Sequence, residues 1–316
     1  MFTDCPGKTL ACLTLSVALS AQADQLAPIA DIHLHWKWNQ KEVTSAEQAV
    51  GILEAQRIDL AVVTGTPPEL ALELADLAPG RVVPIYGIYR VPGEWSTWYR
   101  DEQLLDRVSK ALQSGRYLGI GEVHMIGGFV SHWKAPVIAG LFTLAAKFDV
   151  PVLLHTEFSR ADYTLGLCQA YPSTRFLWAH SGAMLPPEEV SRVLHGCDNV
   201  HAELSARDPW RHRRNPIADA EGRLLPAWRA LIQTFPDRFM IGSDPVWPVE
   251  RLNPWDEADS GWQELSRFLD FHRGWLAELP ADQAEAIRLG NARRFFQPED
   301  SAATERRQTD QPVPRE

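Results

Sequence analysis

The chain has 316 residues, of which 45% are hydrophobic and 23% are charged, as in an ordinary soluble globular enzyme. A formal net charge of −10 argues against nucleic acid or an anionic membrane as the main partner. Beyond the N-terminal leader no segment is long and apolar enough to span a bilayer. The expected partner is a small-molecule substrate. Whether the chain forms a homo-oligomer is left open.

Residues 1–23 have the pattern of a secretory signal peptide. Lys8 precedes an apolar run from Leu10 to Ala21, and "AQA" is a small-x-small cleavage site before Asp24. The alternative is an uncleaved apolar helix at the N-terminus. The sequence therefore predicts export to the periplasm or the medium.

Cleavage after residue 23 would remove two of the four cysteines and leave Cys168 and Cys197 in the mature chain. Two cysteines in an oxidising compartment can pair, and neither belongs to a Cys-x-x-Cys metal motif. We interpret both as structural, and their pairing stays open.

Eight short apolar or β-branched runs alternate with stretches of helical periodicity. The predicted strands cover residues 29–35, 59–65, 82–88, 117–124, 150–155, 175–180, 199–204 and 238–244. Eight such repeats predict one α/β domain over residues 24–296, a (β/α)8 TIM barrel, and no Gly-x-Gly-x-x-Gly follows the first strand to favour a dinucleotide fold. Residues 297–316 are expected to be a disordered tail.

Polar residues collect at the C-terminal ends of five predicted strands. His33 and His35 are two residues apart on the first strand, so their side chains point the same way. The further residues of this kind are Glu122, His124, His155, His180 and Asp244. Such side chains are costly inside a barrel unless they are paired, coordinated or solvated. Nitrogen and carboxylate ligands without thiolates predict a divalent metal, zinc first, with manganese, iron or cobalt as alternatives.

The His-x-His pair, the later histidines and the final aspartate resemble the amidohydrolase superfamily of metal-dependent hydrolases over roughly residues 29–296. The similarity is greatest to the branch that contains lactonases, decarboxylases and hydrolases. The resemblance implies that one ion is held by His33, His35, His155 and Asp244. It implies that His180 holds a second ion or else binds and polarises the substrate.

Glu122 departs from the commonest two-metal pattern, in which a carboxylated lysine bridges the ions on strand four. By the resemblance, Glu122 either bridges two ions itself or lies outside the coordination sphere of a single ion. One or two ions are therefore expected. With zinc bound, water ionises near neutral pH, and Asp244 would accept the proton and pass it to the leaving group, with His180 or the metal stabilising the oxyanion.

Four residues are candidates for substrate binding: Trp36, His124, Glu157 and Arg207. Trp36 falls in a predicted pocket wall, and Arg207 carries a fork of donors suited to a substrate carboxylate. The leading interpretation is an exported metal-dependent hydrolase of a small amide, ester or lactone. The alternatives are a metal-dependent, non-oxidative decarboxylase of a small unsaturated carboxylate, or a barrel that binds a ligand without catalysis.

Overall fold

The computed structural model describes residues 26–125, 132–211, 214–248 and 257–296. The predicted signal peptide and the predicted C-terminal tail lie outside these residues. Among the helices that the structure describes, none combines the length and the apolar character needed to cross a membrane.

Eight parallel strands form the centre of the fold, in the order that the sequence predicts. They are β1 (Ile29–Lys37), β2 (Ile58–Thr66), β3 (Val82–Ile85), β4 (Ile120–His124), β5 (Val152–His155), β6 (Phe176–Trp178), β7 (Val200–Glu203) and β8 (Phe239–Met240). The ladders β1–β3 and β4–β8 are joined at two seams. The Tyr86 amide donates to the Gly119 carbonyl at 2.8 Å, and the Ile32 amide donates to the Ile241 carbonyl at 3.0 Å. The (β/α)8 barrel is thereby confirmed.

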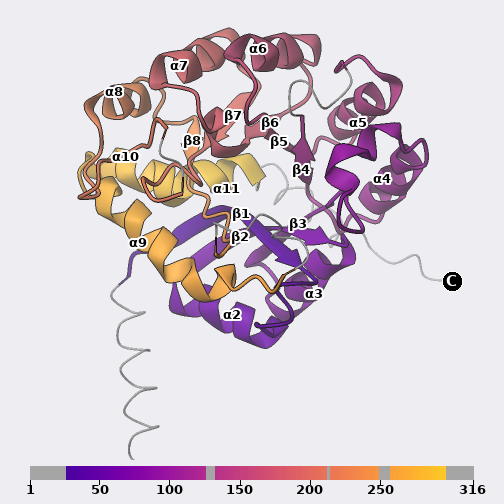
Figure 1. The fold of residues 1–316 in the computed structure, drawn as a ribbon, viewed down its shortest axis with the longest axis horizontal. Coiled ribbons are helices and arrows are strands. Elements are labelled where there is room, and N and C mark those ends of the chain that lie inside the picture. Colours follow the sequence, from indigo (N-terminus) through magenta and orange to yellow (C-terminus); the bar gives the residue numbers. More distant parts are fainter. Residues whose placement is uncertain (1–25, 126–131, 212–213, 249–256, 297–316) are drawn as a thin grey trace, which may run out of the picture.

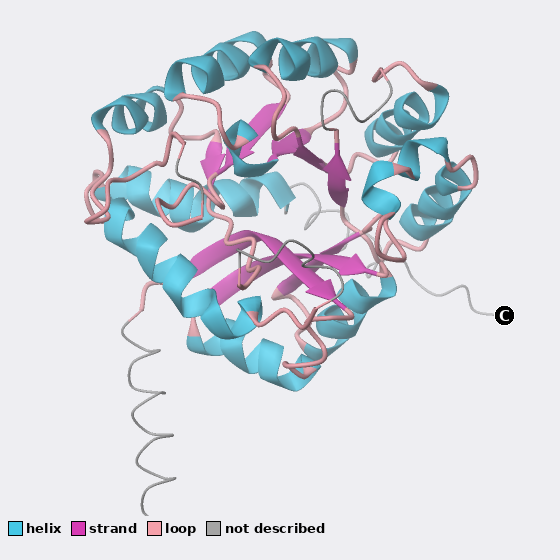
Figure 2. Cartoon of the chain, viewed as in Figure 1, coloured by secondary structure: helices cyan, strands magenta, loops and turns pink. Residues whose placement is uncertain are grey.

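Helices surround the strands as an outer ring (Figure 1, Figure 2). They are α2 (Ala46–Ala55), α3 (Glu69–Leu77), α4 (Leu104–Gln113), α5 (Pro136–Lys147), α6 (Ala161–Ala170), α7 (Pro187–Gly196), α8 (Pro226–Thr234), α9 (Leu265–Leu276), α10 (Ala281–Glu285) and α11 (Asn291–Phe296). Short turns of 3-10 or π type are η1 (Glu94–Ser96), η2 (Trp98–Arg100), η3 (Ala179–Gly182), η4 (Gly261–Glu264) and η5 (Ala286–Gly290). Local signals set several starts: Ser45 and Gln48 form a capping box on α2, and proline opens α5, α7 and α8.

The N-terminal end of the barrel is closed by its own C-terminal segment. Leu289, Ala292 and Phe295 pack on the interior side chains of the strands. The Asn291 side chain donates to the Phe239 carbonyl, where β8 begins. The opposite end, to which the strands deliver their C-terminal residues, is the face where barrel enzymes carry their sites.

A β-bulge in β1 decides which side chains face the interior. Ile32 lines the interior, whereas Leu34 packs outward against the helices. The pairing with β2 shifts between Asp31 and Leu34, so three steps along β1 match two along β2. Strict alternation from Ile32 would have placed His33 and His35 outside the barrel. The bulge turns both histidines inward.

The buried carboxylate of Asp31 stabilises this bulge. Its Oδ1 accepts from the amide of His33 at 3.2 Å and from the amide of Ser243 at 2.9 Å. Because Ser243 follows β8, the same carboxylate also ties the bulge to the last strand. One side chain thus satisfies two backbone donors that the irregular ladder leaves unpaired.

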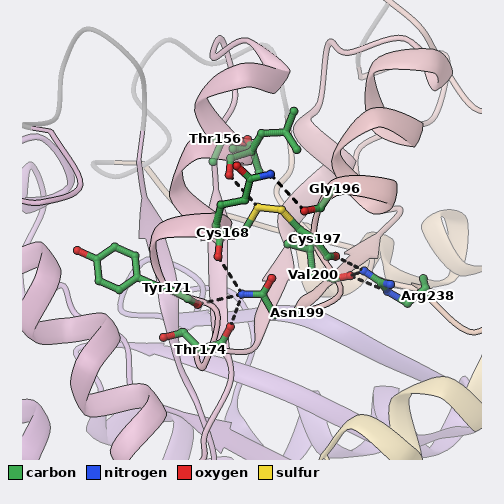
Figure 3. Close-up of a disulfide and its surroundings, with 12 residues drawn as sticks. Thr156, Cys168, Tyr171, Thr174, Gly196, Cys197, Asn199, Val200 and Arg238 are labelled. Atoms are coloured by element: carbon green, nitrogen blue, oxygen red, sulfur yellow. Dashed lines mark hydrogen bonds between the residues drawn. A yellow bond between two sulfur atoms is a disulfide. The ribbon is translucent and has the colours of Figure 1, made fainter.

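Cys168 and Cys197 form a disulfide on the outside of the barrel, which resolves the pairing that the sequence leaves open (Figure 3). Cys168 lies in α6 and Cys197 follows α7, and their Cα atoms are 6.2 Å apart. The Asn199 side chain donates to the carbonyls of Cys168, Tyr171 and Thr174. The disulfide and the Asn199 side chain therefore link the segment that precedes β6 to the segment that precedes β7.

Candidate metal centre

A cavity of about 130 Å³ opens at the C-terminal end of the barrel. Its walls carry His35, Lys37, Glu122, His124, His155, His180, Asp244 and Val246. Five of the six residues predicted as metal ligands therefore line one space, and the sixth, His33, is fully buried beside them.

The first two ligand candidates converge on one point. The Nε2 atoms of His33 and His35 are 3.1 Å apart. Two imidazole nitrogens bound to a tetrahedral zinc ion at about 2.0–2.1 Å would be separated by about 3.3 Å. The spacing of this pair therefore fits a single ion between the two rings.

Glu122 reaches the same space because β4 carries a second bulge. The pairing with β5 shifts between Ile120 and Val123, and both of these side chains pack outward. The shift leaves Glu122 and His124 facing the interior. The bulges in β1 and β4 therefore have the same effect on nearly opposite sides of the cavity: each turns the polar side chains of its strand toward the interior.

The carboxylate of Glu122 lies at the centre of the imidazoles. Its Oε1 is 2.7 Å from Nδ1 of His155 and 3.6 Å from Nε2 of both His33 and His180. Its Oε2 is 3.4 Å from Nε2 of His35. Burial raises the pKa of Glu122, but the surrounding imidazoles lower it more, and the pKa lies well below its usual value. An ionised carboxylate with both oxygens directed at ligand nitrogens can serve one ion or bridge two.

His180 enters the cavity through a left-handed turn rather than from a strand. β6 ends at Trp178, and His180 and Ser181 have φ values of 56° and 48°. This conformation is uncommon for residues other than glycine, and it clusters at functional sites. The turn brings Nδ1 of His180 to 2.8 Å from Oγ of Ser205 and leaves Nε2 facing Glu122.

Arg207 holds that turn and does not line the cavity, so its prediction as a substrate ligand is wrong. The side chain is fully buried and lies over the ring of Trp228. Its Nε donates to the His180 carbonyl at 2.8 Å and its Nη2 to the Ser181 carbonyl at 2.7 Å. Nη1 donates to two further carbonyls, those of Leu185 and Asn215. The donors that could bind a substrate carboxylate are committed to the backbone.

Trp36 is also not a pocket residue. It alternates with His35 on β1, so it points outward and packs edge-on against Trp262 with ring centroids 5.3 Å apart. Its Nε1 donates to Glu73 Oε2 at 3.0 Å. The prediction is corrected by the same alternation that aligns the two histidines.

Asp244 lies beyond the end of β8, in a left-handed conformation with φ of 45°. Its amide donates to the His33 carbonyl at 2.8 Å, which continues the closing seam of the barrel. Its Oδ1 is 3.6 Å from Nε2 of His35 and 4.0 Å from Nε2 of His33. Burial raises the pKa of Asp244, but His33, His180 and His35 lower it further, to below its usual range. The carboxylate is ionised at neutral pH.

Glu203 is a residue of the candidate site that the sequence analysis missed. It is fully buried at the end of β7, where its Oε1 accepts from Nδ1 of His33 at 2.8 Å. The same carboxylate accepts from the backbone amides of His180 and Ser205, each at 2.6 Å. Burial raises its pKa, but His33 lowers it further, to about 2. Its position at the C-terminal end of a predicted strand is the signal that could have identified it.

Of the two remaining substrate candidates, His124 lines the cavity wall beside Glu122. Glu157 contacts a lining residue, with its Oε2 3.3 Å from Nε2 of His155. Lys37, which the sequence analysis did not consider, lines the same wall and forms an ion pair with Asp259 at 3.0 Å.

In the part of the chain that the structure describes, three sets of buried or half-buried residues could each hold an ion, because the donor atoms within a set lie within 4.8 Å of one another. The sets are His33, His35 and Glu122; His33, His180 and Glu203; and Glu122, His124 and His155. Imidazole nitrogens and carboxylate oxygens in such numbers suit a divalent transition metal such as zinc. The donor set therefore fits the metal centre that the sequence predicts.

Imidazoles and carboxylates that converge at the C-terminal ends of the strands are typical of the class of barrel proteins that carry a metal centre. A model of the amidohydrolase family matches residues 100–297, and the chain belongs to this family. The comparison with curated proteins found no match.

Solved structures share the fold at low sequence identity. An amidohydrolase from Burkholderia multivorans with bound zinc is 17% identical, with a TM-score of 0.55 over 85% of this chain and 99% of that chain. A TatD homologue from Escherichia coli K12 is 15% identical, with a TM-score of 0.58 over 85% and 97%. A probable 2-pyrone-4,6-dicarboxylic acid hydrolase from Acinetobacter baumannii is 13% identical, with a TM-score of 0.51 over 85% and 99%. These similarities support the barrel fold.

Proposed function

We propose that this protein is a metal-dependent hydrolase of a small amide, ester or lactone. The observation that carries the proposal is the position of Asp244, an ionised carboxylate that lines the cavity within 4.0 Å of both imidazoles of the His-x-His pair. A base at that position can take a proton from water beside the metal ligands.

The residues of the chain have separate tasks in this proposal. A divalent ion held by His33, His35, His155 and Asp244 would supply Lewis acidity and activate water. Asp244 takes the proton from the attacking water and returns it to the leaving group, which needs a single basic oxygen within reach of both. His180, locked by its turn, either serves a second ion or polarises the substrate carbonyl.

Decarboxylation of a small unsaturated carboxylate is the second candidate, and Lys37 supports it. This cation lines the cavity wall next to the metal ligands and is held in place by Asp259. An ammonium group there would attract a carboxylate substrate. The third candidate, ligand binding without catalysis, has no residue that favours it over the other two.

Turnover in H₂¹⁸O distinguishes the candidates. The zinc- or manganese-loaded protein is incubated with a panel of small esters, lactones, amides and unsaturated carboxylates, and the products are analysed by mass spectrometry. Hydrolysis places one ¹⁸O atom in the product acid, whereas decarboxylation releases CO₂ and adds no ¹⁸O to the remaining organic product. Release of CO₂ without ester, lactone or amide cleavage would overturn the proposal in favour of the second candidate. Binding without turnover across the panel would favour the third.

We also propose that the protein is exported and cleaved after Ala23. The apolar run before "AQA" supports export. The Cys168–Cys197 disulfide supports an oxidising compartment. N-terminal sequencing of protein recovered outside the cytoplasm should begin at Asp24, and a sequence beginning at Met1 would contradict the proposal.

A further inference from the structure

We infer that His124 is a metal ligand, and that with Glu122 and His155 it forms a second ion site beside the His33–His35 site. The inference rests on the proposed metal dependence. It gives His124 a different role from the substrate binding that the sequence predicts.

The donor atoms of Glu122, His124 and His155 lie close together. Nε2 of His124 is 3.7 Å from Glu122 Oε2, and Nδ1 of His155 is 2.7 Å from Glu122 Oε1. The rings of His124 and His155 are stacked with centroids 4.5 Å apart, so their nitrogens border one space. All three donor atoms lie within 4.8 Å of one another. Two imidazoles and a carboxylate are a ligand set that zinc and manganese accept.

His124 is oriented by partners outside the group. The buried Tyr89 hydroxyl lies 2.9 Å from Nδ1 of His124 and accepts from its backbone amide at 3.0 Å. The Trp98 ring donates from Nε1 to the His124 carbonyl at 3.2 Å. With Nδ1 occupied by Tyr89, Nε2 is the nitrogen that faces Glu122. Holding one ring nitrogen so that the other meets a metal is the usual second-shell arrangement of histidine ligands.

The inference moves His155, which the proposed function assigns to the first ion, to the second ion, so that the two groups share only Glu122. The first group takes His33 and His35 from β1, whereas the second takes His124 from β4 and His155 from β5. Glu122 directs Oε2 at both His35 and His124, at 3.4 and 3.7 Å. Its other oxygen, Oε1, contacts His155. One carboxylate thus contacts members of both groups, as a bridging ligand does.

Metal stoichiometry tests the inference independently of turnover. The full-length protein is loaded with Zn²⁺, desalted and measured by elemental analysis, and we expect two ions per chain. His124→Gln should retain one ion. The reciprocal variant His33→Ala/His35→Ala should also retain one. His195→Gln is the matched control, because His195 is exposed on α7, and it should keep two.

The manganese-loaded protein provides a spectroscopic readout. Two carboxylate-bridged Mn²⁺ ions give an exchange-coupled paramagnetic resonance spectrum, and His124→Gln should convert it to that of an isolated ion. Tyr89→Phe keeps the ring but removes the hydroxyl, and it should weaken binding of the second ion by about 10–100-fold. If His124→Gln does not give a native thermal unfolding transition, Tyr89→Phe is used in its place to test the inference.

A wild-type protein that binds a single ion would overturn the inference, as would a folded His124→Gln variant that retains two ions. Loss of both ions from folded His124→Gln would also overturn it, since the two sites would not be separate. Hydrolysis of the ¹⁸O panel by a one-ion protein would leave the proposed function standing. Two bound ions without turnover would overturn the proposed function and leave this inference standing.

Discussion

Glu203 accepts a hydrogen bond from Nδ1 of His33 at 2.8 Å, across 170 positions of sequence, with both side chains fully buried. The contact fixes the ring so that Nε2 faces the cavity. A carboxylate behind a histidine ligand also raises the basicity of the ligand nitrogen. The last residue of β7 therefore orients the first metal-ligand candidate of β1.

Glu203→Gln keeps the size of the side chain but removes its charge. We expect the affinity of the His33–His35 site for zinc to fall by about 10–100-fold, because the amide holds and polarises His33 less well. Competition titration with a zinc-binding dye measures this. Glu188→Gln, an exposed change on α7, is the control and should bind as the wild type does. Unchanged affinity in Glu203→Gln would show that His33 is oriented without it.

Asp244→Asn separates coordination from proton transfer. The amide retains an oxygen and the side-chain size, so most of the metal should stay bound, but the base is lost. Activity should fall by about 10²–10⁴-fold, the usual contribution of general acid–base catalysis. Steady-state kinetics and elemental analysis are made on the same sample. Near-normal turnover with the metal in place would refute the role of Asp244.

Arg207→Met should destabilise the fold by at least about 3 kcal/mol, because four backbone carbonyls would lose the hydrogen bonds that the guanidinium donates to them. Urea unfolding measures the change in the free energy of unfolding. Arg223→Met is the matched control, since its ion pair with Asp219 is exposed, and it should change stability by less than about 1 kcal/mol.

Arg207→Lys tests whether charge alone suffices. A single ammonium group cannot reproduce a fork that reaches several carbonyls, so we expect little recovery of stability. Because two of those carbonyls belong to His180 and Ser181, turnover of the folded fraction should also fall. A lysine variant as stable and as active as the wild type would contradict the positioning role.

His272 predicts how stability depends on pH. Burial, followed by the positive charge of Arg211, lowers the pKa of His272 to about 4. Below about pH 6.5 the unfolded chain takes up a proton at this residue that the folded chain does not. The contribution of His272 to stability is therefore present above pH 6.5, falls by roughly 3 kcal/mol as the pH drops to about 4, and changes no further below that.

His272→Gln should remove this part of the pH dependence while leaving an acceptor for the Nε1 donor of Trp275. The measurement is the difference in unfolding free energy between variant and wild type at pH 7.5, 5.5 and 4.5. Taking the difference cancels the other titrating groups. A difference that does not vary with pH would mean that the His272 pKa is not lowered by folding.

The disulfide closes a loop with a sequence separation of 29 residues. A cross-link of that span contributes about 3–4 kcal/mol by restricting the unfolded chain. Cys168→Ser/Cys197→Ser should lose about that much stability when compared with the oxidised protein. Thiol titration of the denatured, unreduced mature protein should find no free thiol, and finding two would show that the pair does not form.

The sequence by itself determined the fold and the location of the site. Alternation of apolar runs with helical periodicity is a local property, so the order and approximate bounds of all eight strands could be predicted. Residues at the C-terminal ends of parallel strands meet at one end of a barrel whatever the loops do. For that reason His155, His180 and Asp244 could be expected beside the His-x-His pair.

Only the tertiary structure decided which of these side chains face inward and what holds them. The bulge at Asp31 reverses the alternation of β1, and no local pattern reports a shift in register against β2. The contact of Glu203 with His33 and the turn that Arg207 fixes at His180 join segments far apart in sequence. Such contacts depend on how the closed barrel brings strand ends together. Local periodicity records which residues are buried, but not which partners they meet there.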